Sequence, residues 1–440
     1  MTYRDLLQFV LAVVLVSLTP LARADIHSCF MEEVPEVPHP EFSKGVAKFG
    51  MNLFKRVVSA QQEKQPGENT VISPYSIWSA LCLAFFGAEG RTKDQLAGAL
   101  RLSTKISTFS HWRFLDQMLS TAGGVTTAKP SGVRINSKIS NNGYTSRSRS
   151  SSTSTFQSTN KAYFSQDMIL NTCLTSYLPE LRLLDFSRPV EAAERINTDV
   201  SQATRGEITS LVEPQLLTNV DFVLLNAVFF RGAWKTQFPA GNTVTRTFYA
   251  APDRPLGLVP MMTTVGRFNY AYSTPLDASV LELPYESGFS LLVLLPAVDV
   301  GLPELVVEKL SRRRLLEARS LMALTEIEIT LPKFSVTSSI SDLLKQALSD
   351  LGVVDIFTGA ADLRSFTNTS GLQLNTAIHQ ATVTVSEEGT VAAAATGLLG
   401  TRLGPSKVTY DRPFVFLLVD NLMDVPVLTG VLNRPPTDAP

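Results

Sequence analysis

The stretch Glu387–Leu403 reads EEGTVAAAATGLLGTRL and decides how the rest of the chain is interpreted. No period of 2 or 3.6 residues marks a buried face, and its glycines argue against a long helix. It is either a surface loop before a C-terminal strand, or a loop that must later enter a sterically confined space. Side chains this small can enter between two strands of an existing sheet without a clash. The residues that give it this character are Gly389, Thr390, Ala392, Ala393, Ala394 and Ala395.

Composition is that of an ordinary globular protein with a large core. The chain has 440 residues, a formal net charge of −1 and 44% hydrophobic residues. The near-neutral charge gives no global reason to expect nucleic acid as a partner. Length alone would allow two or three domains.

The N-terminus predicts a secretory signal peptide over residues 1–24, followed by a tail over 25–41. Arg4 precedes the apolar run Leu6–Leu18, and Ala22-Arg23-Ala24 supplies a small-x-small cleavage pattern. A membrane anchor is the alternative, but the run is short for spanning a bilayer. We therefore expect a secreted, extracellular protein.

Three cysteines, Cys29, Cys82 and Cys173, do not make a disulfide framework. The odd count leaves at least one thiol free or intermolecular. Cys82 lies in an apolar helical run and is expected to be an inert core thiol. Cys29 lies in the tail and is the better candidate for reactivity.

A basic, low-complexity segment interrupts the chain between about residues 123 and 155. No acidic residue occurs from Gln117 to Gln166, and Thr145–Thr155 reads TSRSRSSSTST. The segment is either a solvated loop or a binding site for a sulfated polysaccharide. Its basic residues and those of its flanks are Lys129, Arg134, Lys138, Arg147, Arg149 and Lys161.

Glu387–Ala395 resembles the hinge of the serpin family, Glu-x-Gly-[Thr/Ser]-x-Ala-Ala-x-Ala. Further runs resemble serpin motifs in the same order, and the resemblance covers residues 42–435. These runs are Asn69–Ile77, Gly87–Thr92, Asn226–Trp234, Val259–Met262, Leu281–Tyr285 and Leu331–Phe334. The resemblance implies one large α/β mixed domain with a dominant mixed sheet, two smaller sheets, surrounding helices and an exposed reactive-centre loop over 387–412.

The resemblance also assigns structural roles to polar residues. His379 would lie beneath the sheet that opens, in the region called the shutter, and Glu387 would pair with Lys333 where the sheet opens. Asp199 stands where the family usually has tryptophan, so the packing of its helix is in doubt. The shutter and breach residues implied are Ser73, Ser76, Asn226, Trp234, Lys333 and His379.

The function implied is suicide inhibition of an extracellular serine protease, which would be held as a covalent complex by a monomeric inhibitor without a cofactor or metal. Thr390 and the alanines are not bulky, charged or proline, which favours inhibition over a non-inhibitory carrier or chaperone of the same fold. A secreted hydrolase is the remaining alternative. The chain has four histidines but no G-x-S-x-G, Walker, H-E-x-x-H or C-x-x-C motif.

The reactive bond is expected at Arg402-Leu403. Fourteen positions forward from the hinge Gly389 end on Leu403, whereas eleven back from Pro413 end on Arg402. Chemistry favours Arg402, because a guanidinium can pair with the buried aspartate of a trypsin-like pocket. Runs such as Trp234–Pro239 and Phe268–Tyr270 resemble the plasminogen activator inhibitors of the family, which makes a plasminogen activator the expected target.

Asn368-Thr369-Ser370 is the sole glycosylation sequon of the chain. We expect Asn368 to carry a glycan if the protein passes through the secretory pathway.

Overall fold

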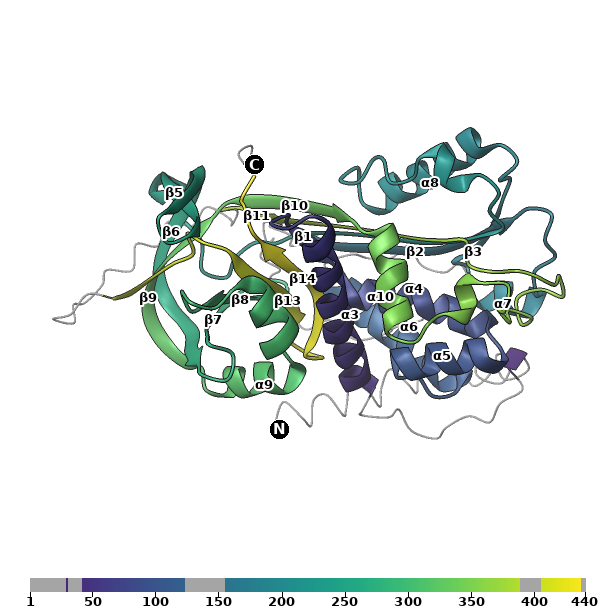
Figure 1. Cartoon of the computed structure of the whole chain (residues 1–440), viewed down its shortest axis with the longest axis horizontal. Coiled ribbons are helices and arrows are strands. Elements are labelled where there is room, and N and C mark those ends of the chain that lie inside the picture. The colour runs from purple at the N-terminus through teal and green to yellow at the C-terminus, as the bar shows by residue number, and fades with distance from the viewer. Residues whose placement is uncertain (1–28, 31–41, 123–154, 388–404, 437–440) are drawn as a thin grey trace, which may run out of the picture.

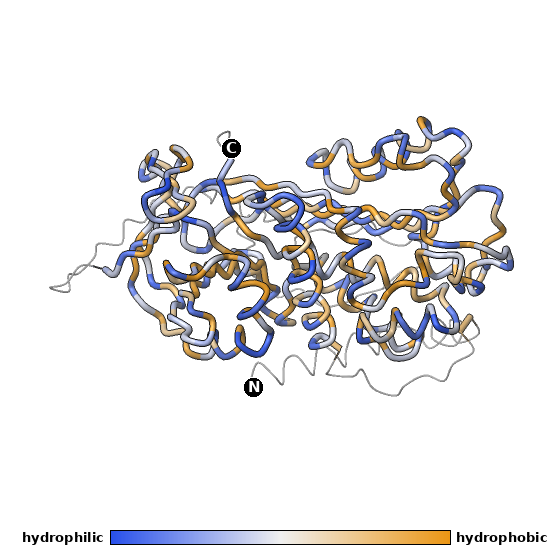
Figure 2. Tube along the Cα trace, in the orientation of Figure 1, coloured by the Kyte–Doolittle hydropathy of each residue, from blue (hydrophilic) through white to orange (hydrophobic). Residues whose placement is uncertain are grey.

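The computed structural model describes residues 29–30, 42–122, 155–387 and 405–436. Two sheets and most of the helices around them share one large hydrophobic core, and a second, smaller core lies on the other face of one sheet (Figure 1). Figure 2 shows hydrophobic residues concentrated along the strands and the helices beneath them, while peripheral turns are mostly hydrophilic.

A five-stranded mixed sheet contains the strand that leads into the hinge. Its order is β10-β11-β4-β2-β3, with β11 parallel to β4 and β2 parallel to β3. The strands are β2 (Thr155–Ser165), β3 (Leu181–Leu184), β4 (Phe222–Arg231), β10 (Phe334–Ser339) and β11 (Thr376–Val385). The first nine residues of β4 are buried, because helices cover both faces of the sheet there.

The two smaller sheets expected from the sequence are joined into one nine-stranded sheet. The 20-residue strand β6 joins them, because it pairs with β5, β7 and β9. The strands are β1 (Thr70–Ile72), β5 (Val244–Ala251), β6 (Arg254–Ser273), β7 (Ala278–Pro284), β8 (Phe289–Pro296), β9 (Ala323–Pro332), β12 (Ser406–Thr409), β13 (Phe414–Asp420) and β14 (Val425–Leu432).

Helix α4 (Pro74–Gly87) is buried along its whole length, between the five-stranded sheet and the other helices. A helix that is apolar all round is stable only when it is covered all round. The other helical elements are α3 (Phe42–Lys64), α5 (Gly90–Leu100), α6 (Lys105–Ala122), α7 (Thr172–Tyr177), α8 (Pro189–Ala203), η1 (Pro214–Leu217), η2 (Ala240–Asn242), η3 (Glu304–Lys309), α9 (Arg312–Ser320), α10 (Ser341–Asp350) and η4 (Asp355–Phe357).

Helix α8 covers the opposite face of the five-stranded sheet (Figure 1) and contains Asp199. Ile196 and Val200 are buried against Val223 and Leu225 of β4. Asp199 accepts a hydrogen bond from the Tyr163 hydroxyl at 3.0 Å. The helix therefore packs on the sheet without the tryptophan, with a polar contact to β2 at that position.

The expectation that Cys29 is reactive was wrong. Cys29 forms a disulfide with Cys173 at the start of α7, with a Cα–Cα distance of 5.6 Å. Phe30 stacks on Phe86 of α4, which holds the segment against the core. Cys82 is a buried free thiol whose pKa is raised by burial, as expected for an inert core cysteine.

Candidate functional site

The candidate site is the junction between β11 and β4, together with the end of β11 where the hinge begins. The two strands pair in parallel over nine positions, from Thr376↔Val223 to Thr384↔Arg231. Twenty residues, 386–405, join the end of β11 to the start of β12 in the other sheet. A chain that turned back at the end of β11 would run antiparallel to both β11 and β4.

A buried polar cluster fastens β11 to β4 and to the start of α4. His379 of β11 is fully buried and lies in register with Asn226 of β4. Its Nε2 accepts a hydrogen bond from the backbone N–H of Ser73 at 3.1 Å. Its Nδ1 contacts Asn226 Oδ1. Because the Ser73 amide can only donate, Nε2 is unprotonated and Nδ1 donates to Asn226.

The imidazole of His379 stays neutral in this environment. Burial lowers the pKa of His379 to about 3, because the charged form would lose its hydration. Both ring nitrogens already have partners. The arrangement suits a structural histidine that links two strands and a helix, and it offers no acid or base to a substrate.

Ser73 and Ser76 extend this cluster along the start of α4. Ser73 Oγ accepts from the Ser76 N–H at 3.2 Å and donates to the carbonyl of Val427 at 2.6 Å, which caps the helix and ties it to β14. Ser76 Oγ lies 2.8 Å from Ser158 Oγ and donates to Asn160 Oδ1 of β2 at 3.2 Å. The pattern Ser-Pro-x-Ser thus caps the helix and holds the sheet.

The end of β11 is anchored by Glu387. Lys333 Nζ lies 2.9 Å from Glu387 Oε2, and Thr243 Oγ1 donates to Oε1 at 2.6 Å. Burial raises the carboxyl pKa, but the hydrogen bonds from Thr243 and Lys333 outweigh it, so the pKa of Glu387 lies below its ordinary value. The structure thus contains the pairing expected from the sequence.

The Glu387–Lys333 pair is partly buried. The side chains retain 16% and 18% of their exposure, respectively. Removing either partner would therefore cost more free energy than removing one partner of a fully exposed pair.

Trp234 completes the anchor. Its indole N–H donates to the carbonyl of Ser386 at 2.7 Å, the residue before Glu387. The ring stacks on Tyr285, with centroids 4.1 Å apart. A rigid aromatic pair beside the nine-stranded sheet therefore holds the point where the chain leaves β11.

Of the predicted site residues that the structure describes, most are brought together in two groups. Ser73, Ser76, Asn226 and His379 form the cluster in the middle of the sheet, and Trp234, Lys333 and Glu387 form the anchor at its end. The predicted hinge residues Gly389, Thr390, Ala392, Ala393, Ala394 and Ala395, and the reactive bond Arg402-Leu403, lie outside the described residues, as do residues 1–24 and 123–154.

Sequence reasoning missed several partners. Thr243, Ser158 and Ser79 were not singled out, although Ser79 accepts from Asn160 at 2.9 Å and from the Trp112 indole at 2.6 Å. Isolated serines and threonines carry no motif, so no signal in the sequence could have identified them. Position in the folded structure alone gives them their role.

The serpin family model, described as serine protease inhibitor, matches residues 44–435. The chain belongs to the serpin family. Iripin-2 of Ixodes ricinus is 31% identical to this serpin over 405 residues, covering 90% of this chain and 94% of that protein. The plasma serine protease inhibitor of Homo sapiens is 29% identical over 392 residues, covering 88% of each chain.

Solved serpin structures share the fold. The structure of native protease nexin-1 with heparin is 26% identical, with a TM-score of 0.75, and covers 89% of this serpin and all of that chain. The structure of human thyroxine-binding globulin in complex with thyroxine has a TM-score of 0.73 at 22% identity. This similarity shows the fold alone.

The described residues also bear on other kinds of site. No helix among them is both long and apolar enough to cross a membrane. Nor do those residues contain a group of three or more His, Cys, Asp or Glu side chains that could hold a metal ion.

Proposed function

We propose that this serpin is a secreted suicide inhibitor of a trypsin-like serine protease. The observation that carries the proposal is the parallel β11–β4 pair, with a hinge of small residues leaving the end of β11. A loop that leaves the end of one of two parallel neighbouring strands can turn back and enter between them as an antiparallel strand.

Energetics support such an insertion. An inserted strand exchanges one β11–β4 ladder for two new ladders, so the net gain is one ladder of about nine positions. At roughly 1 kcal/mol per hydrogen bond this is on the order of 10 kcal/mol. That is comparable to the whole stability of a typical domain. Loop insertion of this kind is a known transition of serpins.

The covalent step is an interrupted proteolysis. The protease serine oxygen attacks the carbonyl carbon of Arg402, the Arg402-Leu403 peptide bond breaks, and the Leu403 amine leaves with a proton. The product is an ester between the protease and Arg402. Insertion of the hinge then displaces the protease before water reaches the ester, because small misplacements of catalytic groups cost large factors in rate.

Arg402 is the proposed specificity residue, and a plasminogen activator is the proposed target. An arginine side chain gains a charge-assisted, bidentate contact in a trypsin-like pocket, whereas Leu403 would gain apolar burial alone. The resemblance of several runs to plasminogen activator inhibitors supports the choice of target.

The test is incubation with trypsin and with a plasminogen activator, followed by a denaturing gel and mass spectrometry. We expect a covalent band, and a released C-terminal fragment that begins at Leu403. A fragment that begins at Gly404 would reassign the specificity residue to Leu403. Arg402→Ala should abolish trypsin trapping while leaving any chymotrypsin trapping in place.

A carrier or chaperone of the same fold is the second candidate, supported by the fold shared with thyroxine-binding globulin. The small hinge residues favour inhibition over this candidate. Complete absence of a covalent band with all proteases tested, together with an uncut loop, would favour the carrier. Turnover of ester or peptide substrates would instead indicate a hydrolase.

Secretion, glycosylation and a polysaccharide partner complete the proposal. The apolar run before Ala22-Arg23-Ala24 supports a signal peptide. Asn368 lies on an exposed turn, which a glycan could occupy. The acid-free segment from Gln117 to Gln166 supports a sulfated polysaccharide partner, and the related protease nexin-1 was solved with heparin. Expression in secreting cells, with and without glycosidase, tests secretion and glycosylation.

A further inference from the structure

A single disulfide lies at the end of the five-stranded sheet away from the Glu387 anchor. Figure 1 shows α7 at that end, and Cys173 near the start of α7 is bonded to Cys29 of the N-terminal segment. Both cysteines are partly exposed, and Cys173 follows two exposed residues, Asn171 and Thr172. The bond therefore joins two surface segments at positions that solvent reaches.

The residue after Cys29 fixes the other side of the bond. Phe30 stacks on Phe86 at the end of α4, with ring centroids 5.6 Å apart, and Lys105 Nζ lies 5.9 Å from the Phe30 centroid. Lys105, the first residue of α6, pairs with Glu89 at 2.7 Å. The disulfide thus links α7 to the helices α4 and α6, and through them to the large core.

Asn171 connects α7 to the sheet. Its side chain accepts a hydrogen bond from the Cys173 N–H at 3.0 Å, which caps α7. Its own N–H donates to the carbonyl of Phe366 at 2.7 Å. The Phe366 ring centroid lies 4.9 Å from that of Phe164 in β2 and 6.0 Å from that of Phe222 in β4. Residues that contact the disulfide-bonded helix therefore also contact two strands of the sheet.

Asn375 joins β11 to β4 at the same end of the sheet. It precedes β11, and its Oδ1 accepts hydrogen bonds from the N–H groups of Asp221 at 2.9 Å and Phe222 at 3.1 Å. Its N–H donates to the carbonyl of Phe222 at 3.1 Å. These contacts hold together the ends of the two strands between which the loop would enter. We call this group the α7 junction and define it by Asn171, Cys173, Phe222, Phe366 and Asn375.

The proposed insertion is long enough to reach the α7 junction. The segment Thr390–Arg402 has thirteen residues, and the β11–β4 ladder has nine positions. An inserted strand takes one residue per position, so four residues would extend past the Thr376↔Val223 pair. Complete insertion would therefore separate Asn375 from Phe222. A bond that restrains α7 also restrains this separation.

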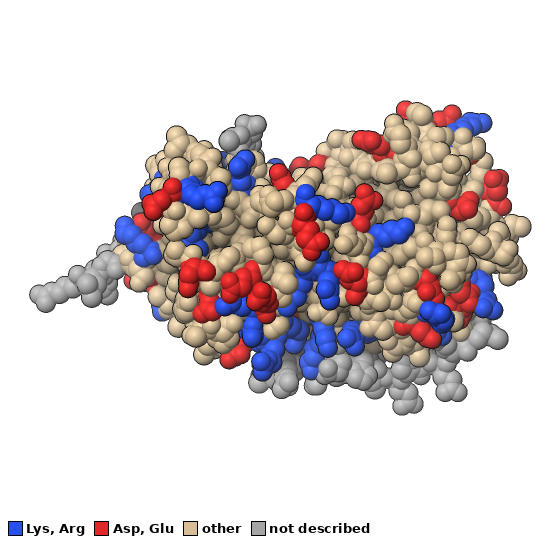
Figure 3. All heavy atoms as spheres, viewed as in Figure 1, with Lys and Arg blue, Asp and Glu red and all other residues tan. Residues whose placement is uncertain are grey.

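Charges around the disulfide are mixed in sign. Figure 3 shows acidic and basic side chains intermixed at the end of the molecule where Figure 1 places α5 and α7. Glu180, between α7 and β3, pairs with Arg113 of α6, and Asp362 pairs with Arg364. Neither sign dominates among the described side chains there, so an attacking thiolate would meet no strong repulsion.

We propose that the Cys29–Cys173 disulfide is a redox-sensitive lock on the α7 junction. The oxidised bond holds this end of the sheet closed, and reduction by a dithiol frees α7 and lets the inserting loop pass the junction more easily. The inference rests on the proposed inhibitory function and adds a regulation to it. Cys82 takes no part, because it is a fully buried free thiol in α4.

The chemistry is a two-electron thiol–disulfide exchange. A thiolate of the reductant attacks one sulfur of the bond, forms a mixed disulfide and releases the other cysteine, which takes up a proton. The second thiol of the reductant then attacks the mixed disulfide, forms a disulfide within the reductant and releases the remaining cysteine as a thiol. The dithiol is oxidised, and Cys29 and Cys173 are reduced.

The test begins with the folded, secreted protein treated with dithiothreitol and then alkylated. We expect mass spectrometry to find alkylation at Cys29 and Cys173, while Cys82 stays unmodified because it is buried. Hydrogen exchange measured by mass spectrometry should then speed up by about tenfold or more in peptides that contain Asn171 or Phe222, because the bond no longer restrains local opening.

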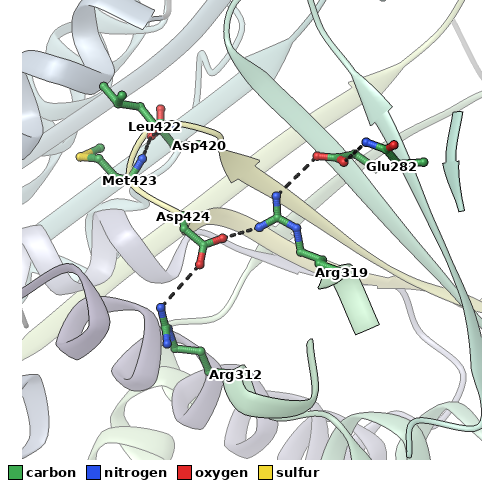
Figure 4. A network of polar contacts seen from close by, with 8 residues as sticks. Glu282, Arg312, Arg319, Asp420, Leu422, Met423 and Asp424 are labelled. Carbon is green, nitrogen blue, oxygen red and sulfur yellow. Dashed lines mark hydrogen bonds and ion pairs between the residues drawn. The ribbon is translucent and has the colours of Figure 1, made fainter. Parts of the chain in front are cut away.

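Helix α9 is the internal reference for this exchange. Arg312 and Arg319 both contact Asp424, and Arg319 also contacts Glu282, so ion pairs hold this helix without a thiol (Figure 4). Exchange in α9 should therefore be the same before and after reduction.

Two variants separate the bond from the reductant. Cys29→Ser/Cys173→Ser should show the fast exchange without dithiothreitol, and dithiothreitol should not change it further. Cys82→Ala is the matched control and should keep the wild-type response. After removal of the reductant, the alkylated wild type and the double variant should form the covalent trypsin complex severalfold faster than the oxidised wild type at saturating protease.

Several results would overturn the lock. Alkylation of Cys82 with the other two would mean that reduction unfolds the domain, and no alkylation would mean that the bond is inaccessible. Faster exchange in α7 but not around Phe222 would mean that the bond stabilises α7 alone. Equal rates of complex formation in both redox states would remove the effect on insertion. If neither state traps trypsin, the proposed inhibitory function fails, whereas exchange around Phe222 still decides whether the bond locks the junction.

Discussion

At the scale of single residues, buried polar groups decide what the molecule can do. His379, Asn226 and Ser73 join two strands and a helix through buried contacts. Water cannot replace a lost partner at these buried positions. A strand that entered between β11 and β4 would have to separate His379 from Asn226. The cluster therefore resists opening of the sheet, and the free energy of the proposed insertion would have to exceed this resistance.

Protonation of His379 should weaken the fold as the pH falls. The unfolded chain takes up a proton near pH 6.5, but the folded imidazole does so only near pH 3. Between these values the unfolded state binds more protons, so stability should fall by up to about 1.4 kcal/mol per pH unit. Urea unfolding between pH 7.5 and 4.5 measures this. In His379→Gln the loss over that range should be smaller, and an identical pH profile would contradict the assignment.

Thr390 is the residue at which the trap can be tested most sharply. Thr390→Arg should turn the inhibitor into a substrate, because a long charged side chain must be desolvated when the hinge enters the sheet. The ester would then be hydrolysed faster than the hinge inserts. We expect cleaved inhibitor and free protease on a denaturing gel, with Thr390→Ser as the matched control. Undiminished covalent complex in Thr390→Arg would count strongly against loop insertion.

At the scale of elements, one covalent bond fastens the N-terminal segment to α7. The disulfide Cys29–Cys173 closes a loop of 144 residues, and Phe30 adds a ring contact with α4. Helix α7 has only six residues and one buried side chain, so it gains little stability from packing. The disulfide therefore stabilises α7, a helix that packing against the core stabilises only weakly.

Thiol counting and reduction should expose this arrangement. Unfolded without reductant, the protein should show one free thiol, Cys82, and three after reduction. Cys29→Ser/Cys173→Ser should lower the free energy of unfolding by about 2–4 kcal/mol, because the unfolded chain regains loop entropy. Urea denaturation followed by fluorescence measures this. Three free thiols in the unreduced secreted protein would rule the disulfide out.

At the scale of the whole molecule, the proposed insertion would give the five-stranded sheet one more hydrogen-bonded ladder than its closed form has. The β11–β4 ladder runs in parallel over nine positions, and parallel pairing is slightly less stable than the antiparallel pairing an inserted strand would make. The Glu387 anchor and the His379 cluster hold the closed form. Under the proposed mechanism, the closed form would therefore hold free energy that insertion of the loop releases.

Cleavage of the loop should release that energy. After cutting near Arg402 by a protease that is not trapped, the hinge can insert and add one ladder, on the order of 10 kcal/mol. We expect the cleaved protein to unfold at a much higher temperature than the intact one in calorimetry. Cleaved Thr390→Arg should show a smaller rise. An unchanged midpoint in cleaved wild type would mean that the loop does not insert.

The sequence by itself determined the local features of this serpin. Capping residues predict the start of α4 at Ser73-Pro74, and small residues after Glu387 predict a loop able to enter a sheet. Family motifs pointed to the Glu387–Lys333 pair and to the shutter. Each of these signals lies within one short segment, where neighbouring residues constrain one another directly.

Only the tertiary structure decided how distant segments meet. It brought Cys29 to Cys173, partly buried the Glu387–Lys333 pair, and joined the smaller sheets through β6. It also placed α3 beside α9, two helices that are far apart in the chain. Such contacts join positions far apart in the chain, and no local pattern records them, because burial and pairing are set only when the whole core has packed.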